Sequence, residues 1–270
     1  MPELPEVETI RRGLAQELKG AVIARFEVQD ARLLKPAAAK RMHERLAGRR
    51  LTDFQRLGKY LDLVLDSEDR FVVHLRMTGQ LLVSRSLSFV APASRFTLSF
   101  SDGRTLSFVD QRRFGEIWLL GPQDPWPSRE PLGPDALEMT AAHFAQTLRR
   151  KKSPIQAALL DQTVIAGVGN IYAQEALFLS RIRPSRKAHR LSAAQAAALH
   201  EALLVTLKNA IAARGSTSRN YRDVYGEEGA AQLAHAVYQK TGEPCPRCRT
   251  LLRGIRIGGR GTVFCPGCQV

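Results

Sequence analysis

The chain has 270 residues, of which 44% are hydrophobic, and it carries 40 lysines and arginines against 26 aspartates and glutamates. This length and composition support sizeable cores and about two domains, and they exclude a disordered protein. The net charge of +14 favours a polyanionic partner, most simply nucleic acid. Residues 135–270, with 19 basic and 9 acidic side chains, form the more basic half.

No stretch approaches the ~20 uninterrupted apolar residues of a membrane-spanning helix. The N-terminus also lacks the basic-then-apolar layout of a signal peptide. We therefore expect a soluble, cytoplasmic protein with no membrane partner.

The first predicted element is a helix over residues 4–19, and Pro2 stands just before it. Without Met1, Pro2 would be a free secondary amine, and an α-amino group titrates near ~8, so a nucleophilic fraction exists at neutral pH. Attack of this amine on a sugar aldehyde carbon would give an iminium ion, with Glu3 beside it to move a proton. The alternative is that the prolines only shape the helix start and the nearby glutamates complement its dipole. The first nine residues alone favour this alternative.

Residues 21–120 show the alternation of half-buried strands, for example at residues 22–28, 61–65 and 96–100. Asp102-Gly103 supplies the turn of a hairpin. The pattern predicts an antiparallel sandwich or barrel with one helical interruption at residues 37–46.

Five prolines between residues 121 and 134 mark a stiff connector. Helical patterns then cover residues 141–150, 155–160, 171–180 and 192–213, the last opened by a capping box of Ser192 and Gln195. A glycine-rich polar loop follows at residues 215–229 and is long enough to be functional. The expected domains are a β-sandwich (2–120), a linker (121–134), a helical domain (135–229) and a terminal finger (236–270).

The finger is predicted from two Cys-x2-Cys pairs separated by 16 residues, Cys245 and Cys248, then Cys265 and Cys268. Two such pairs present four thiolates tetrahedrally to one Zn²⁺, whereas a redox role needs only one pair. Four protein ligands close the site, which predicts structural rather than catalytic zinc. Basic residues around the finger favour contact with nucleic acid; they are Lys240, Arg247, Arg249, Arg253, Arg256 and Arg260.

Three weaker motifs each have a structural alternative. Asn170 is predicted as a helix N-cap and follows a glycine turn. Such a turn suits phosphate binding, but a simple helical hairpin also needs one. Arg112, Arg113 and Phe114 follow a strand and could wedge into a base stack, or could be a solvated face and a core ring. Met77 in the segment 74–79 is equally open to a packing role.

Taken in chain order, these motifs resemble the formamidopyrimidine-DNA glycosylase family, bacterial-type enzymes that excise oxidised purines. The resemblance runs from end to end, through residues 2–9, Lys59, and residues 74–79, 110–115 and 167–173 to the finger. It implies an α+β multidomain fold: an N-terminal β-sandwich with a leading helix, a helical domain with a helix-two-turn-helix motif, and a C-terminal zinc finger. The division drawn from the sequence agrees with this.

The resemblance also implies roles for individual residues. The catalytic set is Pro2 as the nucleophile at the sugar C1′, Glu3 as the acid that assists ring opening, and Lys59. The implied DNA-binding set comprises Glu6 in the N-terminal pocket, Lys59, Asn170 and Arg260 on phosphates, His74 near the backbone, Met77, Arg112 and Phe114 in the vacated stack, and Tyr221 and Tyr225 on a loop over the everted base.

The implied function is a bifunctional DNA glycosylase and abasic-site lyase that removes 8-oxoguanine and formamidopyrimidines from double-stranded DNA in base excision repair. We expect a monomer with one structural Zn²⁺. Two alternatives are an endonuclease VIII-like enzyme for oxidised pyrimidines, which usually has glycine where Leu4 stands, and a non-catalytic zinc-finger protein that binds damaged DNA. The chain departs from common family residues at Gln111, often proline, and at Gln156, where some relatives carry a lysine linked to the lesion.

Overall fold

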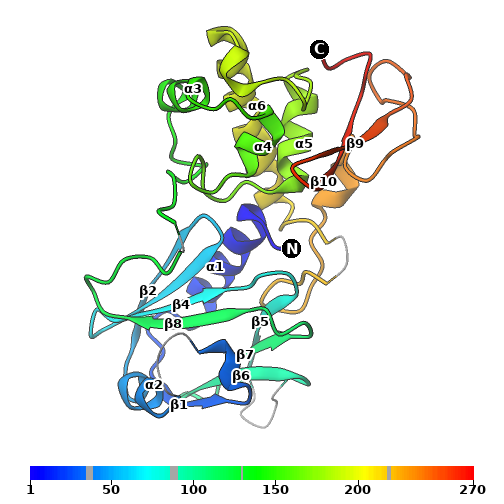
Figure 1. Cartoon of the computed structure of the whole chain (residues 1–270). Helices are drawn as coiled ribbons and strands as arrows, with labels where there is room; N and C mark the ends of the chain where they lie inside the picture. Colours follow the sequence, from blue (N-terminus) through cyan, green and yellow to red (C-terminus); the bar gives the residue numbers. More distant parts are fainter. Residues whose placement is uncertain (35–38, 86–90, 129, 218–219) are drawn as a thin grey trace. The chain divides into compact units, whose positions relative to one another are not determined.

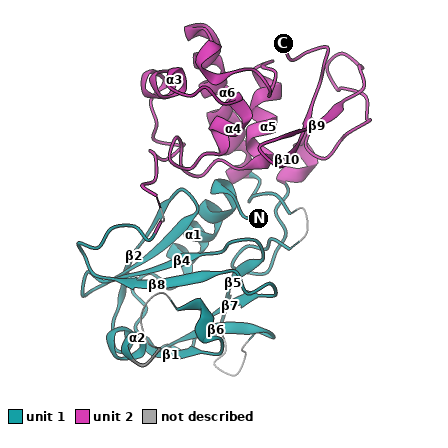
Figure 2. Cartoon of the chain, in the orientation of Figure 1, with its two compact units in different colours: residues 1–127, 213–230 teal, residues 128–212, 231–270 magenta. Residues whose placement is uncertain are grey.

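The computed structural model describes residues 1–34, 39–85, 91–128, 130–217 and 220–270 (Figure 1). It divides into two compact units, each built from two separate stretches of chain (Figure 2). The first unit is Met1–Pro127 with Ala213–Ala230, and the second is Ser128–Ala212 with Ala231–Val270. The sequence division placed residues 213–229 with the helices, but their contacts assign them to the β-rich unit.

Within the described residues, the first unit holds two α-helices, one short 3-10 helix and eight strands. These are α1 (Leu4–Leu18), β1 (Ile23–Val28), η1 (Ala31–Leu33), α2 (Ala39–Leu46), β2 (Leu51–Leu57), β3 (Tyr60–Leu65), β4 (Arg70–His74), β5 (Gly79–Ser84), β6 (Ser94–Phe100), β7 (Thr105–Asp110) and β8 (Glu116–Leu120). The predicted helical interruption is found at Ala39–Leu46, and residues 37–38 of that prediction lie outside the described residues.

The strands form two antiparallel four-stranded sheets, so the predicted sandwich is confirmed. One sheet has the order β2-β3-β4-β8 and the other the order β1-β6-β7-β5. The predicted hairpin joins β6 to β7, with Gly103 at φ +90° in its turn, where a side chain would be strained. Because β4 pairs with β8 and β5 pairs with β7, the β4–β5 and β7–β8 connections both cross between the sheets, side by side.

Helix α1 packs against β2 and β5, the edge strands of the two sheets, and also against β3. Its apolar residues are fully buried and join the core between the sheets; they are Val7, Ile10, Leu14 and Leu18. Burial of each such side chain contributes about 1.5–3 kcal/mol. The helix therefore closes one side of the sandwich, and this fixes the position of the N-terminus.

The polar side of α1 is held by a cluster of charges around Glu8. Its carboxylate accepts hydrogen bonds from Arg11 at 2.8 Å, from Arg12 at 2.8 Å and from Arg56 on β2 at 3.1 Å. Although burial raises the pKa of Glu8, these arginines lower it to about 2. The carboxylate is therefore charged at all pH values at which the protein would be used.

The second unit is mainly helical. Its elements are α3 (Ala141–Arg149), α4 (Ile155–Leu160), α5 (Asn170–Leu179), η2 (Ala188–Arg190), α6 (Ala193–Ala212), η3 (Ala231–Ala234), β9 (Arg253–Ile257) and β10 (Arg260–Phe264). The predicted capping box is confirmed, because Ser192 N–H donates to Gln195 Oε1 at 3.0 Å and Gln195 N–H donates to Ser192 Oγ at 3.2 Å. The predicted N-cap at Asn170 is wrong by one residue: Gly169 is the N-cap and Asn170 is the first helical residue.

Helix α5 carries the rest of this unit, because it packs against α4, α6 and the β9–β10 hairpin. Its Glu175 carboxylate accepts hydrogen bonds from the backbone N–H groups of Ala236, Val237 and Tyr238, at 2.8 to 3.0 Å. The guanidinium of Arg247 lies 4.6 Å from the ring centroid of Phe178 and also donates to its carbonyl. These contacts fasten the cysteine-bearing tail to α5.

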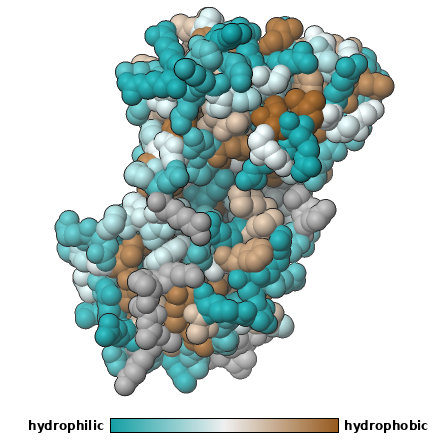
Figure 3. All heavy atoms as spheres, viewed as in Figure 1, coloured by the Kyte–Doolittle hydropathy of each residue, from teal (hydrophilic) through white to brown (hydrophobic). Residues whose placement is uncertain are grey.

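Hydrophilic side chains cover most of the face seen in Figure 3, and the hydrophobic ones lie in small groups. Among the described residues, no helix has the length and apolarity needed to cross a membrane.

The Glu8 cluster generates a test of stability. Because the folded pKa lies below the usual value of 4.5, the cluster stabilises the fold above that pH and loses its effect as the pH falls toward 2. We expect Glu8→Gln to lower the free energy of unfolding at pH 7 by about 1–2 kcal/mol, after allowance for solvent screening. Urea denaturation at a series of pH values should show the difference shrinking below pH 4.5.

The matched control is Glu27→Gln, which removes the exposed pair with Arg25. Its effect should stay within about 0.5 kcal/mol at pH 7, as for other surface pairs. An equal loss in both variants at neutral pH would contradict a special contribution from Glu8.

Candidate active site and nucleic-acid interface

The N-terminus of the first unit is held in place by two carboxylates. Pro2 is buried, and Glu3 is the N-cap of α1. The Glu3 N–H donates to Glu6 Oε2 at 2.7 Å, while Glu6 Oε1 accepts from the Ser216 N–H, also at 2.7 Å. Glu6 thus joins the helix start to the 213–230 segment, a contact across more than two hundred residues that sequence reasoning did not predict.

The 213–230 segment folds closely around this joint. Gly215 has φ +81°, and a Cβ there would lie 3.0 Å from both the Glu6 and Tyr221 side chains. The Tyr221 ring is buried, and burial together with the charge of Glu6 raises the pKa of its hydroxyl. Asp223 closes a turn by accepting from the N–H groups of Tyr225 and Glu227.

The two tyrosines of this loop are therefore placed differently. Tyr221 packs inward, whereas Tyr225 is half exposed and its hydroxyl donates to Glu17 at 3.2 Å. In this conformation only Tyr225 presents its ring to a ligand. Residues 218–219 of the loop lie outside the described part of the chain.

Lys59 and His74 lie close together at one end of the β2–β3–β4 sheet. Lys59 is in the turn between β2 and β3 and is largely buried, as is His74 at the end of β4. Burial, followed by the charges of Arg76 and Lys59, lowers the pKa of His74 to about 3, so the ring is neutral. Its Nδ1 accepts from the Arg76 N–H at 3.1 Å, which leaves the proton on Nε2 as a donor.

Met77, Arg112 and Phe114 are brought together by the two connections that cross between the sheets. The Arg112 guanidinium donates to Met77 Sδ at 3.2 Å and lies 4.8 Å from the centroid of the Phe114 ring. Met77 is 43% exposed and Phe114 50% exposed. Exposed apolar side chains stacked on a guanidinium are suited to entering a base stack, so the core alternative for Phe114 is wrong.

Asp110 organises these two connections, and the sequence reasoning gave it no role. It is fully buried, and its carboxylate accepts from the N–H of Gly115 at 2.7 Å, from the N–H of Arg112 at 3.2 Å and from the Thr78 hydroxyl. A buried carboxyl group that accepts from three donors holds both connections in one conformation. Its position at the end of a strand, before an Arg-Arg-Phe-Gly turn, was the available signal.

In the second unit, Asn170 and Arg260 are brought together through the residue that follows Arg260. Asn170 Nδ2 donates to the carbonyl of Gly261 at 3.0 Å, and Gln174 on the next turn of α5 donates to the same oxygen at 3.3 Å. Gln174 Oε1 also accepts from the Val263 N–H at 2.7 Å. These bonds fasten Asn170, the first residue of α5, to the strand that the exposed Arg260 opens.

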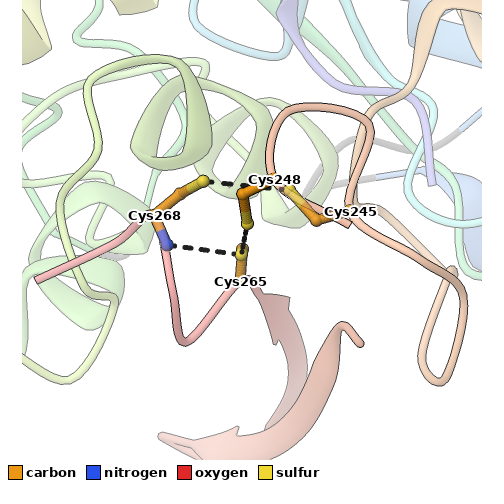
Figure 4. A group of neighbouring side chains, drawn as sticks. All are labelled: Cys245, Cys248, Cys265 and Cys268. Carbon is orange, nitrogen blue, oxygen red and sulfur yellow. Dashed lines mark hydrogen bonds between the residues drawn. The ribbon is translucent and has the colours of Figure 1, made fainter. Parts of the chain in front are cut away.

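The four cysteines converge as predicted (Figure 4). Their Sγ atoms all lie within 4.8 Å of one another, with 3.9 Å between Cys245 and Cys268 and 3.4 Å between Cys248 and Cys265. A tetrahedral zinc with bonds of about 2.3 Å places its sulfur ligands about 3.8 Å apart. Backbone N–H groups of Arg247 and Cys268 donate to the sulfurs, as is common around thiolate ligands. The residues present therefore fit one structural Zn²⁺.

Comparison with known families accounts for nearly the whole chain. Residues 1–117 match the formamidopyrimidine-DNA glycosylase N-terminal domain, residues 130–222 the H2TH domain of the same family, and residues 242–270 the zinc finger found in FPG and IleRS. A β-sandwich with a buried first helix, a helical unit and a four-cysteine finger define the class of zinc-finger DNA glycosylases. The chain belongs to the formamidopyrimidine-DNA glycosylase family.

Relatives and solved structures agree with this assignment. The chain is 44% identical to the formamidopyrimidine-DNA glycosylase of Chloroflexus aggregans and 43% identical to that of Herpetosiphon aurantiacus, in each case over 100% of this chain and at least 99% of the relative. Among solved structures, it is similar to Lactococcus lactis Fpg in complex with abasic-site DNA (TM-score 0.91, 33% identity, 99% of both chains). A complex of a mutant of that protein with Fapy-dG DNA gives the same values.

The finger gives a test of metal content. We expect the purified protein to hold one zinc per chain by elemental analysis, and Cys265→Ser to lose it, because three thiolates bind zinc far more weakly than four. The β9–β10 hairpin should then lose its protection from amide hydrogen exchange, while the β-sandwich keeps its own. Full zinc content in the serine variant would contradict the four-cysteine site.

Asp110 gives a second test. Asp110→Asn replaces one acceptor oxygen with an NH₂ group that faces backbone donors, so we expect a loss of about 1–3 kcal/mol in the free energy of unfolding. The family resemblance also implies that Arg112 reads the orphaned cytosine, so preference for cytosine over adenine opposite an abasic-site analogue should fall once Arg112 is no longer held. Binding assays on both duplexes, with the exposed turn variant Asp102→Asn as the control, measure this; unchanged base preference in Asp110→Asn would refute the role of Asp110.

Proposed function

We propose that the chain is a bifunctional DNA glycosylase and abasic-site lyase that removes oxidised purines from double-stranded DNA in base excision repair. One observation carries this proposal: Pro2, whose nitrogen becomes a secondary amine once Met1 is removed, is buried and directly precedes a helix start fixed by Glu6. A terminal residue is ordinarily mobile. A terminus held this firmly suits a nucleophile that must meet a single sugar carbon.

The chemistry requires removal of Met1, because an acylated proline nitrogen has no nucleophilic lone pair. A base inside the stack cannot be attacked, so the damaged nucleotide is first flipped out, at a cost of a few kcal/mol in unstacking. The Pro2 nitrogen then forms a bond to C1′ as the bond from C1′ to the base breaks; the base leaves with that electron pair and takes up a proton, and the nitrogen loses its own proton. Glu3 delivers a proton to the ring oxygen as the sugar opens to the iminium ion.

Strand cleavage follows from the same covalent link. The iminium withdraws electrons from the sugar, so a proton leaves C2′ and the 3′ phosphate is expelled by β-elimination. Loss of a further proton expels the 5′ phosphate by δ-elimination. Zinc in the finger has four protein ligands and no open position, so its contribution is to hold the finger.

We assign DNA contacts to both units. Lys59, Asn170 and Arg260 bind phosphates around the flipped nucleotide, and the neutral His74 donates from Nε2 to the backbone nearby. The Met77, Arg112 and Phe114 group fills the vacated stack, and Arg112 reads the orphaned cytosine. Tyr225 and the rest of its loop lie over the everted base, and Tyr221 supports that loop from below. The net charge of +14 attracts the duplex over a longer range.

We also propose that the protein acts as a monomer in the cytoplasm, on the nucleoid. A single chain supplies the nucleophile, the wedge and the phosphate contacts, so no second copy is needed. An enzyme that searches for lesions has to work where chromosomal DNA is kept.

The central experiment is trapping with borohydride, which reduces an iminium to a stable amine. The protein is incubated with duplexes that carry 8-oxoguanine opposite cytosine, or thymine glycol, and the covalent product is resolved on a denaturing gel. We expect crosslinking and strand cleavage chiefly on the 8-oxoguanine duplex. Crosslinking chiefly to thymine glycol would favour the endonuclease VIII-like alternative, and salt-dependent binding without any turnover would favour a non-catalytic DNA-binding protein.

The identity of the nucleophile is tested by two changes at the N-terminus. Pro2→Gly replaces the secondary amine with a primary one, and an N-terminal blocking group removes the nucleophile. We expect both to impair crosslinking and cleavage severely while binding to abasic-analogue DNA persists. Wild-type turnover in either protein would refute the assignment of Pro2.

A further inference from the structure

Gln156 is an unusual buried side chain in the second unit. It lies on α4, is 0% exposed, and its Nε2 donates to Asn170 Oδ1 at 3.0 Å. Its other polar atom, Oε1, is buried and has no hydrogen-bond partner among the described residues. An unpaired buried acceptor destabilises a fold, and an apolar side chain of the same size would avoid that cost. The hydrogen bond from its NH₂ group is therefore the contact that distinguishes Gln156 from an apolar side chain at this position.

The NH₂ group of Gln156 controls the orientation of the Asn170 amide. A side-chain amide can turn over and exchange its oxygen and nitrogen with almost no change in shape. Here the Gln156 donor selects the Asn170 oxygen on one side, and the Gly261 carbonyl selects the Asn170 nitrogen on the other, at 3.0 Å. The Asn170 NH₂ group carries two protons and Gly261 accepts one, so a second N–H is available to a ligand.

We propose that Gln156 is a positioning residue for phosphate binding: it holds Asn170 so that an N–H, and not the carbonyl oxygen, faces the DNA backbone. Gln156 itself does not contact DNA, because it has no exposed surface. The inference rests on the proposed function, since Asn170 is assigned there to a phosphate. It adds that an uncharged, buried amide sets the affinity of this subsite.

A turned Asn170 would weaken binding in two ways. It would lose the bond to the Gly261 carbonyl, and it would direct a partial negative charge at a phosphate oxygen. Gln174, which shares the Gly261 carbonyl, bonds to the Asn170 backbone and not to its side chain, so it cannot correct the amide. Among the described hydrogen bonds to the Asn170 side-chain oxygen, the one from Gln156 therefore determines which way the Asn170 amide faces.

The test compares wild type, Gln156→Met, Asn170→Ala and the double variant. The probe is a duplex containing a tetrahydrofuran abasic analogue, which cannot form an iminium, so binding is measured without turnover. Methionine keeps the length and volume of glutamine but has no donor. We expect Gln156→Met to weaken Kd about three- to tenfold, as for loss of one hydrogen bond. In the Asn170→Ala background it should cause no further loss, since the two residues act through one contact.

Three further measurements separate positioning from a structural role. The midpoint of thermal unfolding should stay the same or rise in Gln156→Met, because the unpaired oxygen is gone, and zinc content should be unchanged. The slope of log Kd against log salt should equal that of wild type, whereas Arg260→Ala should reduce it by about 0.9 for one lost phosphate contact. The rate of borohydride trapping at saturating DNA should match wild type, so that the defect lies in binding.

An unchanged Kd in Gln156→Met, or an additional loss in the Asn170→Ala background, would overturn the proposal. If Gln156→Met bound the probe more weakly and also had a lower unfolding midpoint or a lower zinc content, the proposal would be overturned, because Gln156 would then have a structural role. Failure of the proposed function is recognised separately, because wild-type protein would then bind the probe but neither crosslink nor cleave an 8-oxoguanine duplex.

Discussion

The first unit depends on the burial of helix α1 between the edge strands of two sheets. A sandwich of two four-stranded sheets leaves its edges open, and α1 covers β2 and β5 with a continuous apolar stripe. The residues just before the helix, Pro2 and its N-cap Glu3, are buried with it. A reactive group at that terminus is thus positioned by the hydrophobic core.

The exposed group of Met77, Arg112 and Phe114 is positioned by the strand topology. Two connections cross between the sheets next to each other, and each carries part of the exposed Met77, Arg112 and Phe114 group. Loops of this kind are ordinarily adaptable, but buried Asp110 fixes both. In the second unit, side-chain amides fix the backbone in a similar way. Asn170 and Gln174 fasten the start of α5 to β10, the strand that Arg260 opens.

Local sequence signals predicted much of this fold. Alternating strands, an Asp-Gly turn, a Ser192 capping box and the cysteine spacing act over short distances, and the structure confirms each of them. The roles of individual site residues stay predictions, although the structure shows which of them lie together. The amine chemistry of Pro2 made it a candidate nucleophile, and the other motifs with the family resemblance then favoured that role over a purely structural one.

The sequence could not reveal contacts between distant segments. Nothing in the local pattern of residues 213–230 indicates that they pack on α1, because the attachment uses a backbone N–H, a glycine and isolated apolar side chains such as Val224, which form no periodic pattern. The position of Tyr221 also depends on a contact between distant segments. We expected this residue over a ligand, but it is buried beside Glu6. Gly169, and not Asn170, caps α5. The prediction failed here because two adjacent residues with good capping propensity cannot be told apart without the backbone angles.

The attachment of this loop bears on how such an enzyme can change during evolution. Glu6 accepts a hydrogen bond from the main-chain N–H of Ser216, which every residue except proline provides, so this bond does not use the serine side chain. Gly215 is constrained by its left-handed backbone and crowded surroundings, and Gly229 is constrained because a Cβ there would lie 2.1 Å from the Gly215 carbonyl oxygen. Exposed side chains beyond this anchor can therefore change during evolution while the start of α1 keeps its geometry.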